Sequence, residues 1–550
     1  MPARVLRDPR APIVAFAVSA AAAFVLLMYL ARGMGFYFDE WNFVLDRRGH
    51  SLDTFLKPHN EHIVLVPVVT YKVLLASVGL GHHWPYLAVL LVMHVLLGFG
   101  VYLLARPGVG AWPAVMAATL VLFAGLAWQN MIWPFQIGFV GSVLGGVWAF
   151  VALDRVGRRA QVLACGALLF SIASSSLGVP MALGVGAEIL AQRRSRSLWV
   201  AAVPLGLYVL WYLGYGVSTI TNQGVVHAAP WAVSAVAAAA GGVLGLGSTW
   251  GVPLALAVTA ALAWRLAVGP PTPRLLGVLV AGVTFWALTG AARSVFQPPV
   301  PPESSRYITF GVVVVLLVVV ELASGLAAVP RLFAFGVAIT LLAVALGVPP
   351  LRDNALQLRT ITHTTDAELG AMQLVPRSAP PSYVPDPRGS PQISAGRYFA
   401  AARSYGSAGD SPGELPTDLS GDRAQADRVL QELVGRLSAS PRASTGAPPA
   451  LERTSGGTAR QGRACTTVRP AAGAQVVVTA VVPAQGLRIR AGGANGVEVK
   501  MRRFADAFAN GPVGTVAPGP AQLLRLPADA STQPYRVQLA SQGALAVCSA

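Results

Sequence analysis

Charged side chains are scarce in this chain, where they make up 12% of 550 residues, while 54% are hydrophobic. A soluble protein of this size normally carries about a quarter charged residues. This scarcity excludes an ordinary soluble enzyme and indicates a polytopic membrane protein. The long apolar runs stop near residue 348, and the remaining 200 or so residues are rich in Pro, Gly, Ser, Asp and Arg. The chain therefore contains at least two domains.

Lysine is nearly absent, since only Lys57, Lys72 and Lys500 occur. The formal net charge of +17 comes almost entirely from arginines, many of them in short segments between apolar runs, where they act as topology signals. No block rich in Lys and Arg of the nucleic-acid-binding type is present. We therefore exclude nucleic acid as a partner.

Cysteine is also rare, with three in the chain, and no CxxC or Cys/His metal spacing accompanies them. Cys165 lies inside an apolar run, as an inert core residue would. Cys465 and Cys548 bracket a region of β-like segments, which favours a disulfide if that region faces an oxidising compartment.

Eleven apolar runs approach the roughly 17 to 25 residues that cross a bilayer as a helix. They are 12–31, 84–105, 111–127, 137–153, 160–177, 178–191, 198–215, 250–268, 275–291, 308–328 and 332–348. With the N-terminus cytoplasmic, arginines fall in every cytoplasmic connection, as the positive-inside rule requires. This holds if the Ala/Gly-rich run 231–247 does not cross but lies at the interface or forms a re-entrant hairpin. The first run is interpreted as a retained anchor rather than a signal peptide.

The C-terminal region is expected to be extracytoplasmic under this topology. Residues 351–462 read as helices, including 351–374 and 422–437, with linkers rich in Pro, Gly and Ser. Residues 463–550 read as a small β-sandwich-like domain closed by the Cys465–Cys548 disulfide, because short alternating segments follow one another between Gly turns. The predicted fold class is thus an all-α polytopic transmembrane bundle over residues 1–350, followed by an α+β region.

The polar residues of the predicted outer face gather in three segments. The first outer loop, 32–62, begins with "GFYFDEWNF" and ends with "HNEH", and "IVLVPVVTYKVLL" after it suits an interfacial helix. Residues 128–136 read "WQNMIWPFQ", and residues 292–307 read "ARSVFQPPVPPESSRY". The adjacent carboxylates Asp39 and Glu40 are costly at a membrane surface unless they have a use.

This arrangement resembles the glycosyltransferase-C (GT-C) superfamily of integral-membrane glycosyltransferases. The features that match are an acidic pair just after the first span, an interfacial helix, a late outer loop with arginines and an outer soluble domain. The resemblance covers about residues 10–350. It implies inverting transfer of a sugar from a polyprenyl-phosphate carrier to a glycan, lipid or protein acceptor of the cell envelope. It also implies a multi-pass protein of the bacterial cytoplasmic (inner) membrane.

The chemistry of such a transfer suggests roles for individual residues. One carboxylate takes the acceptor proton, for which Asp39 is the first candidate and Glu40 the second. The departing phosphate needs cations and hydrogen-bond donors, which Arg293, Arg306 and Tyr307 could supply. The expected substrate-binding residues are Trp41, His59, Glu61, His62, Trp133 and Gln136.

Several alternatives remain open at this stage. Asp39 and Glu40 could mark only the first polar turn after a helix, and Arg293 and Arg306 could be interfacial anchors. The "HNEH" stretch is interpreted first as the start of a surface helix; a divalent metal is the weaker reading, so no metal ligand is assigned. The competing functions are a non-catalytic membrane scaffold with an outer binding module and a lipid or solute transporter. Polar residues concentrate at the outer rim rather than at mid-membrane, which argues against transport.

Overall fold

A computed structural model describes residues 8–298, 300–325, 330–440 and 446–550 of the chain. The end of the predicted span 308–328 and five linker residues, 441–445, lie outside the described residues. The chain forms two compact units. Unit 1 comprises residues 1–34, 46–78 and 83–359, and unit 2 comprises residues 35–45, 79–82 and 360–550. The predicted boundary near residue 350 falls inside one continuous helix, α17, which begins in unit 1 and ends in unit 2.

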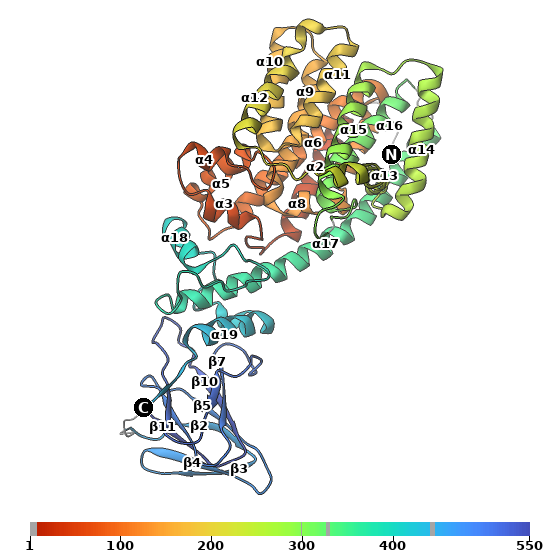
Figure 1. The fold of residues 1–550 in the computed structure, drawn as a ribbon. Helices are drawn as coiled ribbons and strands as arrows, with labels where there is room; N and C mark the ends of the chain where they lie inside the picture. Colours follow the sequence, from red (N-terminus) through yellow and green to blue (C-terminus); the bar gives the residue numbers. More distant parts are fainter. Residues whose placement is uncertain (1–7, 299, 326–329, 441–445) are drawn as a thin grey trace. The chain divides into compact units, whose positions relative to one another are not determined.

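Unit 1 is helical. Its helices pack side by side, as α9, α10, α11 and α12 do in Figure 1. Within the described residues, nine helices are long and apolar enough to cross a membrane. They correspond to α2 (Ala11–Leu30), α6 (Trp84–Val109), α9 (Ile137–Leu153) and α12 (Trp199–Tyr215) each with the short turn before it, α13 (Asn222–Val243), α14 (Ser248–Val268), α15 (Pro273–Arg293), α16 (Ser305–Ala323) and most of α17 (Pro330–Leu374). This content is consistent with a multi-pass membrane protein.

Three of the predicted spans are shorter helices in the structure. They are α7 (Ala111–Leu122), α10 (Arg158–Ser174) and α11 (Gly178–Ala191). The predicted runs 160–177 and 178–191 are two separate helices, α10 and α11, because Ser175 is extended and the chain turns before Gly178.

The Ala/Gly-rich run lies in α13, which is one of the nine by length and composition. Gly290, in the last turn of α15, lies against Ala228, and Gly242 lies against Ile308 and Val312 in the first two turns of α16. The two contact points on α13 are 14 residues apart, or about 21 Å along a helix. Both contact points lie against the ends of α15 and α16 that segment 294–304 connects. Helix α13 therefore crosses these two helices obliquely. The prediction that this run does not cross the membrane stays a prediction.

Smaller elements complete unit 1. The amphipathic stretch after the first loop forms α5 (Leu65–Ser77), with α4 (Leu52–Leu56) before it, and the segment 125–136 forms three single turns, η1 (Gly125–Ala127), α8 (Gln129–Ile132) and η2 (Pro134–Gln136). Another such turn, η3 (Ser195–Ser197), precedes α12.

Unit 2 combines helices with two antiparallel sheets. Its helices are α3 (Glu40–Asp46), α18 (Ala395–Tyr405), the turn η4 (Leu415–Thr417) and α19 (Ser420–Val434), besides the last turns of α17. Its strands are β1 (Leu437–Ala439), β2 (Leu451–Ser455), β3 (Gly457–Gln461), β4 (Cys465–Pro470), β5 (Val476–Val481), β6 (Leu487–Ala491), β7 (Val497–Arg502), β8 (Gly514–Val516), β9 (Gln522–Leu524), β10 (Arg536–Ser541) and β11 (Leu545–Ser549). The strand orders are β1-β9-β6-β11-β4-β3 and β2-β5-β10-β7-β8. In β5, β7 and β10, buried residues alternate with more exposed ones, as in strands that bury one face.

The predicted disulfide is present. Cys465 and Cys548 lie directly opposite each other on β4 and β11, with their Cα atoms 4.1 Å apart. The bond joins positions 83 residues apart and so ties the last strand to the beginning of the β-rich region.

One side chain connects α19 to the sheet region. Asp427 is buried, and its carboxylate accepts hydrogen bonds from the backbone N–H groups of Arg503, Phe504 and Ala505 at 2.9 Å each. These residues follow β7, and α19 lies beside that strand (Figure 1). A single acceptor thus satisfies three backbone donors of a buried turn.

Candidate functional site

The acidic pair of the first loop belongs to unit 2, and its two carboxylates differ in environment. Glu40 is fully buried, and its Oε2 accepts a hydrogen bond from the backbone N–H of Tyr37 at 3.0 Å. This bond closes the turn that begins α3, so Glu40 has a structural partner. Asp39 is only half-buried. The residue before it, Phe38, has φ +43°, a conformation that non-glycine residues adopt rarely and that often accompanies functional sites.

Trp41 is a core residue of unit 2. Its ring is fully buried and lies 6.1 Å from that of Tyr398, and its Nε1 donates to the carbonyl of Phe36 at 3.2 Å. No face of the indole is open to solvent, so the expected sugar contact has no support in this environment.

The "HNEH" stretch is a tight turn, and the prediction of a helix start there is wrong. The backbone groups of His59 and His62 bond to each other in both directions at 3.0 Å, forming an isolated antiparallel bridge. Asn60 makes the turn with φ +53°, and the following helix starts only at Leu65. Asn tolerates this left-handed conformation because its short side chain can bond locally, which explains why the chain turns here. Glu61 lies at the tip of this turn, with a side chain that is only 14% exposed.

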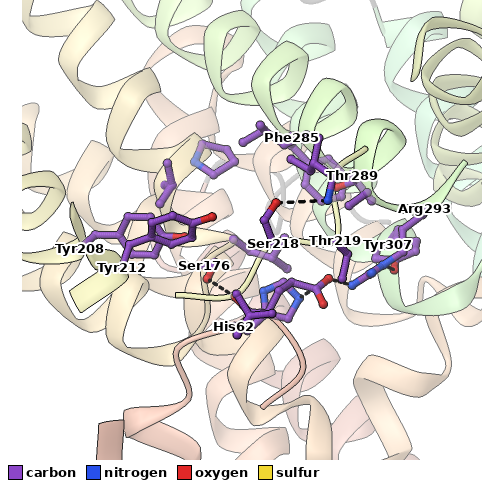
Figure 2. Close-up of a pocket in the computed structure, with 18 of the residues that line it drawn as sticks. His62, Ser176, Tyr208, Tyr212, Ser218, Thr219, Phe285, Thr289, Arg293 and Tyr307 are labelled. Atoms are coloured by element: carbon purple, nitrogen blue, oxygen red, sulfur yellow. Dashed lines mark hydrogen bonds and ion pairs between the residues drawn. The ribbon is translucent and has the colours of Figure 1, made fainter. Parts of the chain in front are cut away.

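A pocket of about 340 Å³ lies beside this turn in unit 1. Its walls come from the N-terminal part of α11, the end of α12, the segment 217–220 and the end of α15. Figure 2 shows Arg293 and Tyr307 on one side of the pocket and Tyr208 and Tyr212 on the other. Most of the remaining lining is apolar: Leu177, Val179, Pro180, Val209, Val217, Ile220, Phe285, Leu288 and Ala292.

The polar side of the pocket is an ion pair with a phenol behind it. Glu61 and Arg293 are paired directly, and their side chains are only 14% and 12% exposed. Arg293 also donates from Nε to the hydroxyl of Tyr307 at 3.0 Å, and Tyr307 is buried. The arginine is therefore held on two sides at the pocket wall, and a fork-shaped donor in this position suits an oxyanion.

His62 lies next to this pair. Its Nε2 is 3.8 Å from Glu61 Oε1, and its ring meets that of Phe139 edge-on. Burial, followed by the nearby His59 and Arg306, lowers the pKa of His62 to about 4, so it is neutral at pH 7. Its Nδ1 is buried without a hydrogen-bond partner, and so is Thr219 Oγ1 in the pocket wall.

Arg306 and Gln136 are predicted site residues that do not line the pocket. The guanidinium carbon of Arg306 lies 6.0 Å from the centre of the Trp133 ring, and its Nε is buried without a partner. Gln136 is fully buried, and neither atom of its amide has a partner. Each such atom costs roughly 1–3 kcal/mol when left unsatisfied. Unsatisfied buried atoms of this kind favour a polar ligand or ordered water beside them.

The structure thus brings together in unit 1 the predicted residues Glu61, His62, Arg293 and Tyr307, with Arg306 acting on His62 from nearby. Sequence reasoning missed Tyr208 and Tyr212, which lie four residues apart on α12 and so share a face. That spacing was a usable signal. Thr219 could not have been found, because its segment carries no motif. In the part of the chain that the structure describes, no three His, Cys, Asp or Glu side chains are placed to hold a metal ion.

No protein-family model matches the chain, and no curated protein matches it significantly.

Proposed function

We propose that this protein is an inverting glycosyltransferase that moves a sugar from a polyprenyl-phosphate carrier to a cell-envelope acceptor. The proposal rests on the pocket of unit 1. Most of its lining is apolar, and one side carries Arg293 hydrogen-bonded to Tyr307, a pair of donors suited to a phosphate. A lipid phosphate has the same two parts, a hydrocarbon chain and an oxyanion.

The edge of the pocket also suits a lipid ligand. Val209, Tyr212 and Leu288 line the pocket and are 53%, 39% and 43% exposed on the surface of the helical unit. They lie on α12 and α15, two of the helices that are apolar enough to span the bilayer. A prenyl chain could therefore reach the pocket sideways from the membrane.

In the proposed reaction, Asp39 takes the proton from an acceptor hydroxyl while that oxygen attacks the anomeric carbon. The bond from the anomeric carbon to the phosphate oxygen breaks with inversion, and the polyprenyl phosphate leaves with one more negative charge. Arg293, Arg306 and Tyr307 stabilise that charge. Asp39 is preferred to Glu40 as the base because Glu40 is fully buried, whereas Asp39 is half-buried.

Three finer features belong to the same proposal. The helical unit crosses the membrane about eleven times, counting the shorter helices α7, α10 and α11 and leaving out α13. The acidic pair and unit 2 face the outside, where the disulfide can persist. The two sheets of unit 2 pack face to face as a β-sandwich, because each presents a row of buried side chains on one face.

The test is transfer of radiolabelled sugar from a panel of polyprenyl-phosphate sugars in membranes that contain the wild type, Asp39→Asn or Glu303→Gln. Glu303 is an exposed carboxylate outside the pocket, so its variant is the charge-matched control. We expect Asp39→Asn to lose at least about a hundredfold in rate and Glu303→Gln to stay unchanged. If no donor gives transfer above empty membranes with native envelope acceptors, the proposal fails and a membrane scaffold becomes the better explanation.

A further inference from the structure

The six-stranded sheet of unit 2 carries charge of one sign only. Its strands, β1, β9, β6, β11, β4 and β3, contain no Asp or Glu, and they contain the arginines Arg460, Arg469, Arg488 and Arg490. The other sheet carries both signs, and there Arg536 pairs with Glu452 and Lys500 with Glu498. The six-stranded sheet therefore differs from an ordinary protein surface, on which charges of both signs are mixed.

The strand register places these arginines on one side of the sheet. Four residues are successive partners across β3, β4, β11 and β6, namely Arg460, Thr467, Ala546 and Arg490. They therefore project to the same side, while the alternate residues, such as the fully buried Ile489, project into the interior. Arg460, Thr467 and Arg490 are exposed, so their side is the solvent face. Three strand intervals, or about 14 Å, separate Arg460 from Arg490.

The other two arginines extend this row along the strands. Arg469 lies two residues beyond Thr467 on β4, and Arg488 lies two residues before Arg490 on β6, about 7 Å along each strand. None of the four arginines forms an ion pair with a carboxylate in the part of the chain that the structure describes. We call the side of the sheet that carries Arg460, Arg469, Arg488 and Arg490 the basic face.

Arg488 indicates that the basic face lacks an anion. The residue is only 7% exposed, and its Nη2 donates to the carbonyl of Ser440 at 3.1 Å. Its Nε is buried without a hydrogen-bond partner. Arginines are almost never buried to this extent unless they are paired, because an uncompensated buried charge is costly. An anion bound beside Arg488 and Arg490 would supply both the opposite charge and the missing acceptor.

The side chains that this face does not carry narrow the class of partner. None of the six strands contains Phe, Trp or Tyr. Single-stranded nucleic acids stack their bases on aromatic rings, and protein interfaces are usually anchored by such rings, so neither partner fits well. Sites for a membrane surface add large apolar side chains, whereas the small residues Thr467 and Ala546 lie between the arginines here. The face suits a slender polyanion that is bound by charge.

We propose that the basic face binds a linear phosphodiester polymer, in which small polyol units join successive phosphates. The charges of such a polymer lie in its chain, so an extended strand on the sheet presents them directly to the arginines. Each guanidinium can pair with a phosphate through two parallel N–H groups. In an acidic polypeptide the carboxylates point to several sides of the chain, and fewer of them reach the face. This inference does not depend on the proposed function.

The test is binding of a fluorescent glycerol phosphate oligomer to the full chain in nanodiscs of phosphatidylcholine. We expect the wild type to bind with an affinity that falls steeply with salt concentration, because bound arginines release counterions from the polymer. Arg460→Gln combined with Arg490→Gln should lower the affinity at least about tenfold, and both positions are exposed, so the variant should fold. The control is Arg388→Gln combined with Arg453→Gln, which removes two charges from exposed positions outside this sheet and should leave the affinity unchanged.

Each alternative partner has its own outcome. If polyglutamate or single-stranded DNA of equal charge binds the wild type more tightly than the oligomer does, the phosphodiester polymer is refuted in favour of that partner. If nanodiscs of phosphatidylglycerol abolish binding of the oligomer, the face binds lipid headgroups instead. If the wild type does not bind the oligomer, or if the Arg460→Gln, Arg490→Gln variant binds it equally well, the proposed role of the basic face is wrong.

Discussion

A buried charge cluster in unit 1 allows a sharp prediction about stability. Arg274, at the start of α15, bonds from Nε to Glu188 Oε2 at 2.6 Å and from Nη2 to Asp154 Oδ1 at 2.7 Å. It also donates from Nη2 to the carbonyl of Phe150 at 3.1 Å. The three acceptors lie on or directly after α9 and α11, so one guanidinium joins three helices.

The expected cost of Arg274→Ala follows from the burial of its main partner. Glu188 is 1% exposed and would be left as an uncompensated charge, which costs roughly 3–5 kcal/mol. Replacing both partners with apolar residues of similar volume, Arg274→Met with Glu188→Met, should be close to neutral because no charge is then left buried. At roughly 2–4 °C per kcal/mol, the single variant should melt about 10 °C lower.

The chain contains a natural reporter for this measurement. Cys165 on α10 is buried and reduced, and the other two cysteines are joined in the disulfide. A thiol-reactive fluorescent dye should therefore label the purified protein only when the helical unit unfolds. The reasoning is refuted if Arg274→Ala melts with the wild type, or if the double variant is less stable than the single one.

Three further predictions concern other parts of the chain. Replacing both Cys465 and Cys548 with serine should lower the free energy of unfolding of the β-rich region by roughly 4–5 kcal/mol, because the loop that the disulfide closes is long. Limited proteolysis of the full chain in mild denaturant should then cleave the β-rich region first. Unchanged resistance to the protease would contradict this prediction. Burial, with the nearby Asp418 carboxylate, raises the pKa of Asp410 to about 7. The folded state therefore binds a proton that the unfolded state releases at lower pH, which stabilises unit 2 at low pH. Protection of unit 2 from hydrogen exchange should be greatest at low pH and should decrease as the pH rises through 7. Asp410→Asn should flatten that pH profile, and a profile equal to that of the wild type would refute the assignment. Gly184→Ala should destabilise the helical unit by about 1–3 kcal/mol in the dye assay, because a Cβ there would come within 2.5 Å of a backbone carbonyl oxygen on α15. The control is Gly186→Ala, whose Cβ would meet only a side chain at 3.6 Å, so it should have little effect.

Several elements of the fold could be predicted from local pattern alone. Alternation of apolar and polar residues predicts a β-rich domain over residues 463–550, where the structure has β4 to β11, and the long apolar runs locate most of the candidate spanning helices. The disulfide was also predictable, because two cysteines at the ends of a β-like region had no other partner. These features depend on residues that are close in sequence or unique in the chain.

The candidate site was predictable only as a set of residue types. In the sequence, carboxylates and arginines lie at the ends of apolar runs. A charged side chain in such a position is costly, which makes it a candidate functional residue. It did not distinguish Asp39 from Glu40, since that difference arises when the backbone turn at Phe38 directs one carboxylate onto the N–H of Tyr37.

What the sequence by itself determined is the class of protein, since hydropathy and β-alternation are properties of short segments. Only the tertiary structure decided that "HNEH" is a tight turn and that Glu61 pairs with Arg293, more than 200 positions away in the chain. It also decided that α13 lies obliquely across α15 and α16, through close contacts at Gly290 and Gly242. Such pairings depend on packing between segments that are distant in the sequence. They therefore cannot be inferred from composition or periodicity, which are properties of short segments.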